Sequence, residues 1–277
     1  MSDWSWPSNK AWPMPAKPPS PLTWQWRSQK GTERQENRDA CGLFANAVTT
    51  FAVVMDASAQ GENGQDFNMF WMTQVIQALA QHPSGPTVEQ VLAHMRTAQR
   101  MLRPPRFLLE TACFCALLIR HDLGRAWILA CGDCRIGLEK NGQDIAWLSP
   151  VHSQANMLGE AFTLEHALSD ARHTVTRCLK VKRFTAPEVL EAPFDPASTW
   201  LLATDGYWVD QLTGQLGDPH FADDRSLLKL GRSVTPLHAS DSDNLRVVGA
   251  LHTPASCMHS LGISSQNWLS HANQPKH

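Results

Sequence analysis

Four aspartates that lie far apart in the sequence each stand beside a short hydrophobic run. Asp56, Asp133 and Asp205 follow such runs, and Asp243 comes just before another. A buried strand that ends in a carboxylate brings a hard oxygen ligand to the rim of a sheet, and Mg²⁺ and Mn²⁺ prefer such ligands. A single aspartate in this position is usually only a turn former. The joint pattern therefore carries the hypothesis of one divalent-metal site.

The residues between these aspartates show the patterns of the elements that would position them. Apolar runs bounded by turn residues predict strands, and apolar residues at helical spacing predict helices. The predicted strands are 41–45, 51–55, 111–120, 125–131, 199–204 and 245–251, with a hairpin at 138–148. The predicted helices are 64–82 and 87–102, with a further helical stretch near 223–231. Two helices followed by a series of hairpins indicate α+β layers rather than βαβ units.

Composition narrows the function classes. The chain has 277 residues, 43% hydrophobic residues and a formal net charge of −2, so as a whole it is neither a nucleic-acid binder nor a disordered acidic protein. It has no apolar run of about 18 residues, so we expect no membrane span. The first residues lack the pattern of a signal peptide, and the seven cysteines are scattered, so we expect a cytoplasmic protein with reduced thiols.

Three regions differ in composition. Residues 1–27 hold five of the 11 tryptophans and six of the 18 prolines, which is typical of an extended arm. These tryptophans could lie in a groove of the same chain or of a partner, and we favour the same chain. Residues 28–254 are predicted to form the folded domain, and residues 255–277 are a polar tail.

The order of several short motifs resembles that of the metal-dependent PP2C (PPM-type) serine/threonine protein phosphatases, over residues 31–251. Each motif alone is weak, whereas their shared order is specific. The matching segments are 34–39 (Arg-x-x-Asn-Glu-Asp in the family), 51–57 (a strand ending in Asp-Gly), 132–135 (Gly-Asp-Ser-Arg), 148–153 (Leu-Thr-x-Asp-His-Ser), 176–179 (Thr-Arg-Ala-Leu), 204–206 (Ser-Asp-Gly) and 243–244 (Asp-Asn).

The resemblance implies an α/β/β/α sandwich of two antiparallel sheets flanked by helices. It also implies one to three bound Mn²⁺ or Mg²⁺ ions. Asp56 would bridge two ions, Asp205 and Asp243 would hold the first, the backbone carbonyl of Ala57 would hold the second, and Asp133 would belong to a third, weaker position.

The implied activity is hydrolysis of phosphoserine and phosphothreonine on proteins by a metal-activated water. Asp56 and Arg34 would be the catalytic residues, because a planar guanidinium can engage two phosphate oxygens. The implied partners are a phosphoprotein substrate and a cognate serine/threonine kinase, with no nucleic acid and no membrane.

Three departures from the family pattern fall near the second metal. Residues 56–60 lose three glycines of the family's Asp-Gly-x-Gly-Gly, Arg38 replaces a glutamate, and Val151 replaces the aspartate before His152. An inward-pointing Arg38 would repel a cation, whereas an outward-pointing Arg38 would pair with an acid. These departures motivate the alternative of a catalytically impaired PP2C-like scaffold that binds a phosphoprotein or kinase. A third reading is a structural protein in which the aspartates only form turns.

Cys131 and Cys134 have the Cys-x-x-Cys spacing that occurs in redox and zinc sites. They lie at the end of a predicted strand rather than at a helix N-terminus. We therefore interpret them as bystander thiols.

Overall fold

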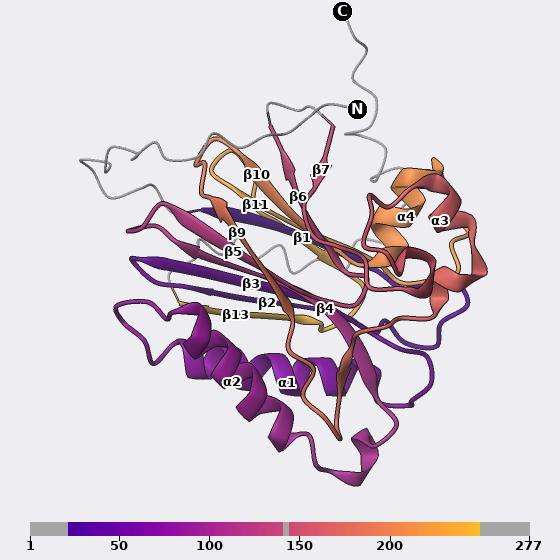
Figure 1. The fold of residues 1–277 in the computed structure, drawn as a ribbon, viewed down its shortest axis with the longest axis horizontal. Helices are drawn as coiled ribbons and strands as arrows, with labels where there is room; N and C mark the ends of the chain where they lie inside the picture. The colour runs from indigo at the N-terminus through magenta and orange to yellow at the C-terminus, as the bar shows by residue number, and fades with distance from the viewer. Residues whose placement is uncertain (1–21, 141–143, 250–277) are drawn as a thin grey trace, which may run out of the picture.

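The structure is a computed structural model that describes residues 22–140 and 144–249. Two β-sheets lie face to face in the middle of the molecule, and the helices lie outside them (Figure 1). This arrangement confirms the predicted α/β/β/α sandwich. In the described ranges, no helix is both long enough and apolar enough to cross a membrane.

The first sheet has six strands in the order β12-β1-β11-β10-β6-β7. Its strands are β1 (Thr23–Gln29), β6 (Arg135–Glu139), β7 (Ala146–Trp147), β10 (Thr199–Ala203), β11 (Arg225–Gly231) and β12 (Leu237–Ser240). The β1–β12 pair is parallel, and the other pairs are antiparallel.

The second sheet has the order β13-β2-β3-β4-β5-β9, and the short β8 pairs with the start of β4. Its strands are β2 (Asp39–Ala45), β3 (Thr49–Ala57), β4 (Thr111–Arg120), β5 (Arg125–Cys131), β8 (Leu179–Lys180), β9 (Glu188–Pro193) and β13 (Leu245–Gly249). Here the β13–β2 pair is parallel. Each sheet is thus mixed rather than purely antiparallel, because a strand from late in the chain joins one from its start without a hairpin.

The core between the sheets includes the first strand of the chain. Trp24 and Trp26 of β1 are 1% and 0% exposed and pack among the inward-facing side chains of both sheets. The folded domain therefore begins within the predicted arm of residues 1–27, and the boundary at residue 27 was placed too late. Alternate tryptophans on a strand point to one face, and the surrounding prolines concealed this pattern. The remainder of the arm and the tail 255–277 lie outside the described residues.

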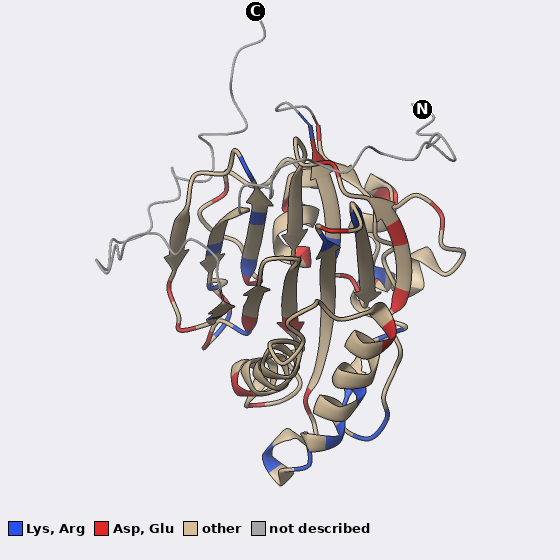
Figure 2. Cartoon of the chain, turned by 90° about the vertical axis from the view of Figure 1, so that its left-hand side faces the viewer, with Lys and Arg blue, Asp and Glu red and all other residues tan. Residues whose placement is uncertain are grey.

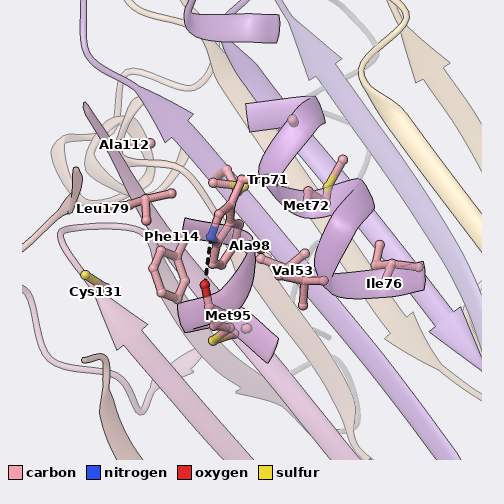
Figure 3. Close-up of a cluster of buried hydrophobic side chains, with 14 of the residues drawn as sticks. Val53, Trp71, Met72, Ile76, Met95, Ala98, Ala112, Phe114, Cys131 and Leu179 are labelled. Atoms are coloured by element: carbon pink, nitrogen blue, oxygen red, sulfur yellow. Dashed lines mark hydrogen bonds between the residues drawn. The ribbon is translucent and has the colours of Figure 1, made fainter. Parts of the chain in front are cut away.

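Helices α1 (Gly64–Leu79) and α2 (Val88–Met101) cover the outer face of the second sheet. Figure 3 shows their contact with the strands: Trp71 is fully buried, its indole Nε1 donates to the carbonyl of Met95 at 3.2 Å, and its ring lies 5.0 Å from that of Phe114. Burial of such large side chains stabilises the helical layer by about 1.5–3 kcal/mol each. Helix α2 begins with a capping box formed by Thr87 and Gln90.

The outer face of the first sheet is covered at one end by α3 (Leu164–Leu168) and α4 (Asp205–Thr213). Trp208 of α4 packs with Leu201 and Leu227 of the sheet. The 3₁₀ turns η1 (Pro105–Phe107), η2 (Gln154–Asn156) and η3 (Asp170–His173) complete the described elements.

Several elements differ from the sequence prediction, and two of them bear on the site. The stretch near 223–231, predicted to be helical, is strand β11, and the helix α4 at 205–213 was not predicted. β11 is paired on both sides, with β1 and β10, and both of its faces are covered. A strand buried on both faces has a nearly continuous apolar pattern that local periodicity cannot distinguish from a buried helix.

Candidate metal centre

Two aspartates lie opposite each other at the end of the second sheet where β2 begins and β3 ends. Asp39 begins β2, Asp56 lies near the end of β3, and the antiparallel register pairs them directly. Because side chains alternate along a strand, Asp39 shares the face of Cys41, and Asp56 shares the face of Val54. Both of these neighbours point into the core between the sheets. The two carboxylates therefore end the inward-facing rows of adjacent strands.

Asp133 and Asp205 come from the corresponding edge of the first sheet. Asp133 lies between β5 and β6, and its backbone carbonyl accepts a hydrogen bond of 2.8 Å from the indole of Trp208. Asp205 directly follows β10 and begins α4. Gly206 is needed next to it, because a Cβ there would lie 2.0 Å from the carbonyl oxygen of Asp224. The close packing of α4 on the start of β11 thus fixes the position of Asp205.

Sequence reasoning missed two further acids, Asp223 and Asp224, directly before β11. Because β10 and β11 are antiparallel, the start of β11 lies at the same sheet edge as the end of β10. Asp224 is buried, and its two oxygens accept from the backbone N–H groups of Gly31 (2.9 Å) and Arg38 (2.7 Å). The Asp-Asp pair next to the run Leu227–Leu230 was the available signal. The wrong assignment of this stretch as a helix hid it.

These acids share one electrostatic environment. Burial, reinforced by the charges of Asp133 and Asp223, raises the pKa of Asp205 to about 7. Burial and the charge of Asp39 raise the pKa of Asp56 well above its usual range, and Asp205, Asp223 and Asp133 add to this effect. The carboxyl groups of Asp56 and Asp205 are close enough to share a hydrogen bond. Without a compensating cation, these groups disfavour being charged together.

The unpaired oxygens of this cluster fit a divalent cation. Within residues 22–140 and 144–249, Oδ1 of Asp39, Oδ1 of Asp133 and Oδ1 of Asp205 are buried without a hydrogen-bond partner. A buried carboxylate oxygen without a partner is costly, and a hard cation with oxygen ligands would compensate it. No three His, Cys, Asp or Glu side chains of the described chain are already arranged as a metal site. The cluster is therefore a set of suitable donors rather than an assembled coordination sphere.

Arg34, the predicted phosphate anchor, lies beside this cluster. Its Nε and Nη2 both donate to Oδ1 of Asp223, at 2.9 and 2.6 Å, and its side chain is 28% exposed. The structure thus brings Arg34 to the acids, where one of them holds it. A planar guanidinium has five N–H donors, so further donors remain for another anion.

Arg38 lies next to the loop that follows Asp56. Its Nη1 donates to the carbonyl of Ser58 at 2.8 Å, and its Nε lies 3.4 Å from a carboxylate oxygen of Glu36. The aliphatic part of Arg38 packs so closely on Gly64 that a Cβ there would lie 3.1 Å from Arg38 Cδ. Both alternatives for Arg38 are thus met in part: it pairs with an acid, and it places a cation beside the loop of Ala57.

A third arginine makes an ion pair within the cluster. Nη1 of Arg172, from η3, donates to Oδ2 of Asp205 at 3.2 Å; the Arg172 side chain is 24% exposed and that of Asp205 is 12% exposed. A cavity of about 270 Å³ opens beside this pair, and Asp223, His220 and Phe221 also line it. Four aspartates (Asp205, Asp210, Asp218 and Asp223) and two arginines (Arg172 and Arg225) line the cavity, so it is a polar space next to the acids.

The structure does not bring Asp243 into the cluster. Its side chain is exposed, and its backbone carbonyl accepts from Gln65. The buried residue of this segment is Asn244, which donates to the carbonyl of Asp39 at 2.9 Å and accepts from the indole of Trp26 at 3.1 Å. The segment thus holds the start of β2 in place, whereas the charge of Asp223, and not that of Asp243, contributes to the raised pKa values of Asp56 and Asp205.

The Cys-x-x-Cys thiols are separated by the second sheet. Cys131 belongs to the core under the helices, whereas Cys134 belongs to the core between the sheets. Burial raises the pKa of Cys131 to about 12. The two thiols are therefore neither a joint ligand pair nor a reactive redox pair.

The comparison with known proteins places the fold. No family model matches the sequence, and no curated protein matches it. Solved structures match with high coverage. The PPM Ser-Thr phosphatase MsPP from Mycobacterium smegmatis, in complex with cacodylate, is 19% identical with a TM-score of 0.63 over 77% of this chain and 99% of that chain.

Two other structures give the same result. Serine/threonine phosphatase Stp1 from Staphylococcus aureus is 16% identical, with a TM-score of 0.63 over 76% of this chain and 95% of that chain. The catalytic domain of the phosphatase PstP, in complex with 2 manganese ions, is 16% identical, with a TM-score of 0.58 over 76% of this chain and 98% of that chain. The chain therefore has the fold of the bacterial PPM phosphatases, at 16–19% sequence identity to these three structures.

Proposed function

We propose that this protein is a Mn²⁺- or Mg²⁺-dependent phosphatase of phosphoserine and phosphothreonine in proteins. The observation that carries the proposal is the convergence of buried aspartates from both sheets at one edge of a PPM fold. The pairing of Asp39 with Asp56 and the proximity of Asp205 to Asp56 support it. The matching solved structures are described as serine/threonine phosphatases, and one of them holds manganese.

In this proposal, Asp56, Asp205 and Asp223 hold the principal cation, Asp133 supports a weaker position, and the carbonyl of Ala57 serves a second one. A bound cation would supply Lewis-acid activation of water and neutralise phosphoryl charge. Asp224 acts as a positioning residue, because its carboxylate fixes the backbone around Gly31 and Arg38.

Substrate phosphate would enter the cavity beside Asp205. Arg34 is the proposed anchor, because its guanidinium is already held at the acids by Asp223. Arg172 and His220 line the cavity, which Arg34 does not line, and their hydrogen-bonding groups stand against the four aspartates of its lining. A serine/threonine kinase acting on the same phosphoproteins is the corresponding partner.

Hydrolysis of p-nitrophenyl phosphate and of a phosphothreonine peptide, with Mn²⁺ titrated, tests the function. We expect Mn²⁺-dependent turnover in the wild type and none above background in the double variant Asp56→Asn, Asp205→Asn. Without metal, the Tm of the double variant should be at least that of the wild type, because the variant loses two mutually repelling carboxylates. Full activity in the folded double variant, or no turnover by the folded wild type at any Mn²⁺ concentration, would falsify the proposal.

A catalytically impaired scaffold is the second candidate, and two ion contacts favour it. Arg172 is paired with Asp205, and Arg38 binds the carbonyl of Ser58 beside the loop of Ala57. Both cations compete with a metal for the same oxygens or repel it. Calorimetric titration with Mn²⁺ separates the candidates: a scaffold of this kind binds no ion or only one at millimolar concentration, whereas a working phosphatase binds more than one.

A further inference from the structure

A second cavity, lined mainly by basic and apolar residues, lies beside helix α2. It has a volume of about 590 Å³, and its lining includes four cationic residues (Arg96, Arg100, Arg103 and Lys182) and three apolar ones (Leu108, Val181 and Phe184). We call it the basic groove. In Figure 2, Lys and Arg gather in the lower part of the molecule, along α2 and the segments beside it.

The groove is held open by its own contacts. The buried side chain of Gln99 donates to the carbonyls of Lys180 and Val181, which fastens the segment after β8 to α2. The guanidinium of Arg96 lies over the ring of Phe184, 5.2 Å from its centre, so this pair fixes one wall. The groove is therefore a shaped feature of the fold.

Its cations have no acidic partners. Among the residues that the structure describes, Arg96, Arg100, Arg103 and Lys182 take part in no ion pair, although many other arginines do. Arg100 and Arg103 are exposed, and half of the Leu108 surface is also exposed. On a chain of net charge −2, four cations without acidic partners in one groove are a local reversal of charge.

The groove is connected to the metal centre through β8. Leu179 and Lys180 pair with Ala112 and Thr111 at the start of β4. The neighbouring residues of β4 pair with Asp56 and Ala57 of β3. The chain that lines the groove at Val181 to Phe184 thus continues directly from the sheet edge that carries Asp56. The groove and Asp56 thus lie at the same end of the second sheet.

We propose that the basic groove binds an acidic segment of the phosphoprotein substrate and so docks it next to the metal centre. This proposal rests on the phosphatase function. Arg100, Arg103 and Lys182 would pair with Asp, Glu or phosphorylated side chains, and the exposed Leu108 would contact apolar residues between them. An acidic peptide fits better than a nucleic acid, because the one aromatic ring that lines the groove is already covered by Arg96 and so is not free to stack on a base.

Fluorescence anisotropy of the full chain tests the proposal without turnover. The probes are two fluorescein-labelled peptides without phosphate that differ only in a run of five glutamates or five glutamines. The test variant is the double change Arg100→Ala, Arg103→Ala, which leaves the Arg96–Phe184 pair intact. The matched control is Arg232→Ala, Arg246→Ala, which removes two exposed cations elsewhere. Hydrolysis of p-nitrophenyl phosphate is measured on each protein in parallel.

We expect the wild type and the control to prefer the glutamate peptide, with an affinity that weakens as salt is added. The test variant should lose roughly three- to tenfold of that affinity, as expected for two exposed ion pairs. Its turnover of p-nitrophenyl phosphate should be unchanged. Equal affinity for the two peptides, an equal loss in the control, or tighter binding of a single-stranded oligonucleotide would overturn the proposal. Glutamate-specific binding without any turnover would keep the groove and overturn only the phosphatase function.

Discussion

Arg172 and Asp205 form an ion pair at the edge between the two sheets, with Nη1 of Arg172 3.2 Å from Oδ2 of Asp205. The pair joins η3, in the segment that the sequence left unassigned, to the carboxylate that follows β10. Arg172 therefore supplies part of the positive charge that the acids need, at the oxygen that a metal would also use.

Replacing Arg172 with alanine should strengthen Mn²⁺ binding. The cation would no longer compete with a guanidinium for Asp205, and we expect roughly a three- to tenfold gain in affinity, since the ion pair is partly exposed. Calorimetric titration measures it. The control is Arg177→Ala, whose guanidinium binds the carbonyl of Ala186 instead. Weaker Mn²⁺ binding in Arg172→Ala than in the control would show that Arg172 supports the site rather than competes for it.

Asp223 and Asp243 make a matched pair for locating the metal ligand. Asp223→Asn should abolish Mn²⁺-dependent turnover, because its charge bears on Asp56 and Asp205 and its carboxylate also holds Arg34. Asp243→Asn should leave turnover within about twofold of the wild type, because exposed substitutions away from a site usually have small effects. The reverse result would return the ligand role to Asp243.

Arg38→Glu should raise the affinity for a second ion. The substitution removes the cation that binds the Ser58 carbonyl and places an acid near the loop of Ala57. The glutamate restores the residue that the PP2C-family pattern has at position 38. Residues that support metal ligands typically change metal affinity or activity by roughly 10–100-fold. Arg38→Met keeps the packing on Gly64 and removes only the charge, so it should give a smaller gain. If Mn²⁺ stoichiometry and turnover stay unchanged in both variants, Arg38 does not control this position.

Stability without metal should fall as the pH rises through about 7. The folded state raises the pKa of Asp205 from 3.8 to about 7, so it binds this proton more tightly than the unfolded chain does. The stability from this group is full below about pH 4 and is lost as the pH rises through 7, at about 1.4 kcal/mol for each unit between the two pKa values.

Thermal unfolding between pH 5 and 8 tests this dependence. Asp205→Asn should flatten it, and Mn²⁺ should raise the Tm of the wild type more at pH 8 than at pH 5. Identical pH profiles for wild type and Asp205→Asn in the absence of metal would contradict the assignment.

Local pattern was sufficient for much of the fold. The strands 111–120 and 125–131 and the helices near 64–82 and 87–102 were predicted from apolar spacing and turn residues, and the structure has them at nearly the same bounds. Prolines and Thr87 mark the start of α2 in the sequence itself. These elements are short-range features, and their residues carry the information for them.

The sequence by itself determined that carboxylates end buried strands, and it thereby placed Asp56, Asp133 and Asp205 among the candidates. Only the tertiary structure decided which acids meet. Asp223 joins them because β11 pairs between β1 and β10, whereas Asp243 stays at the surface beside the buried Asn244. The physical reason is that strand pairing and sheet stacking are long-range: they depend on which faces are buried together, and no local spacing of residues specifies that.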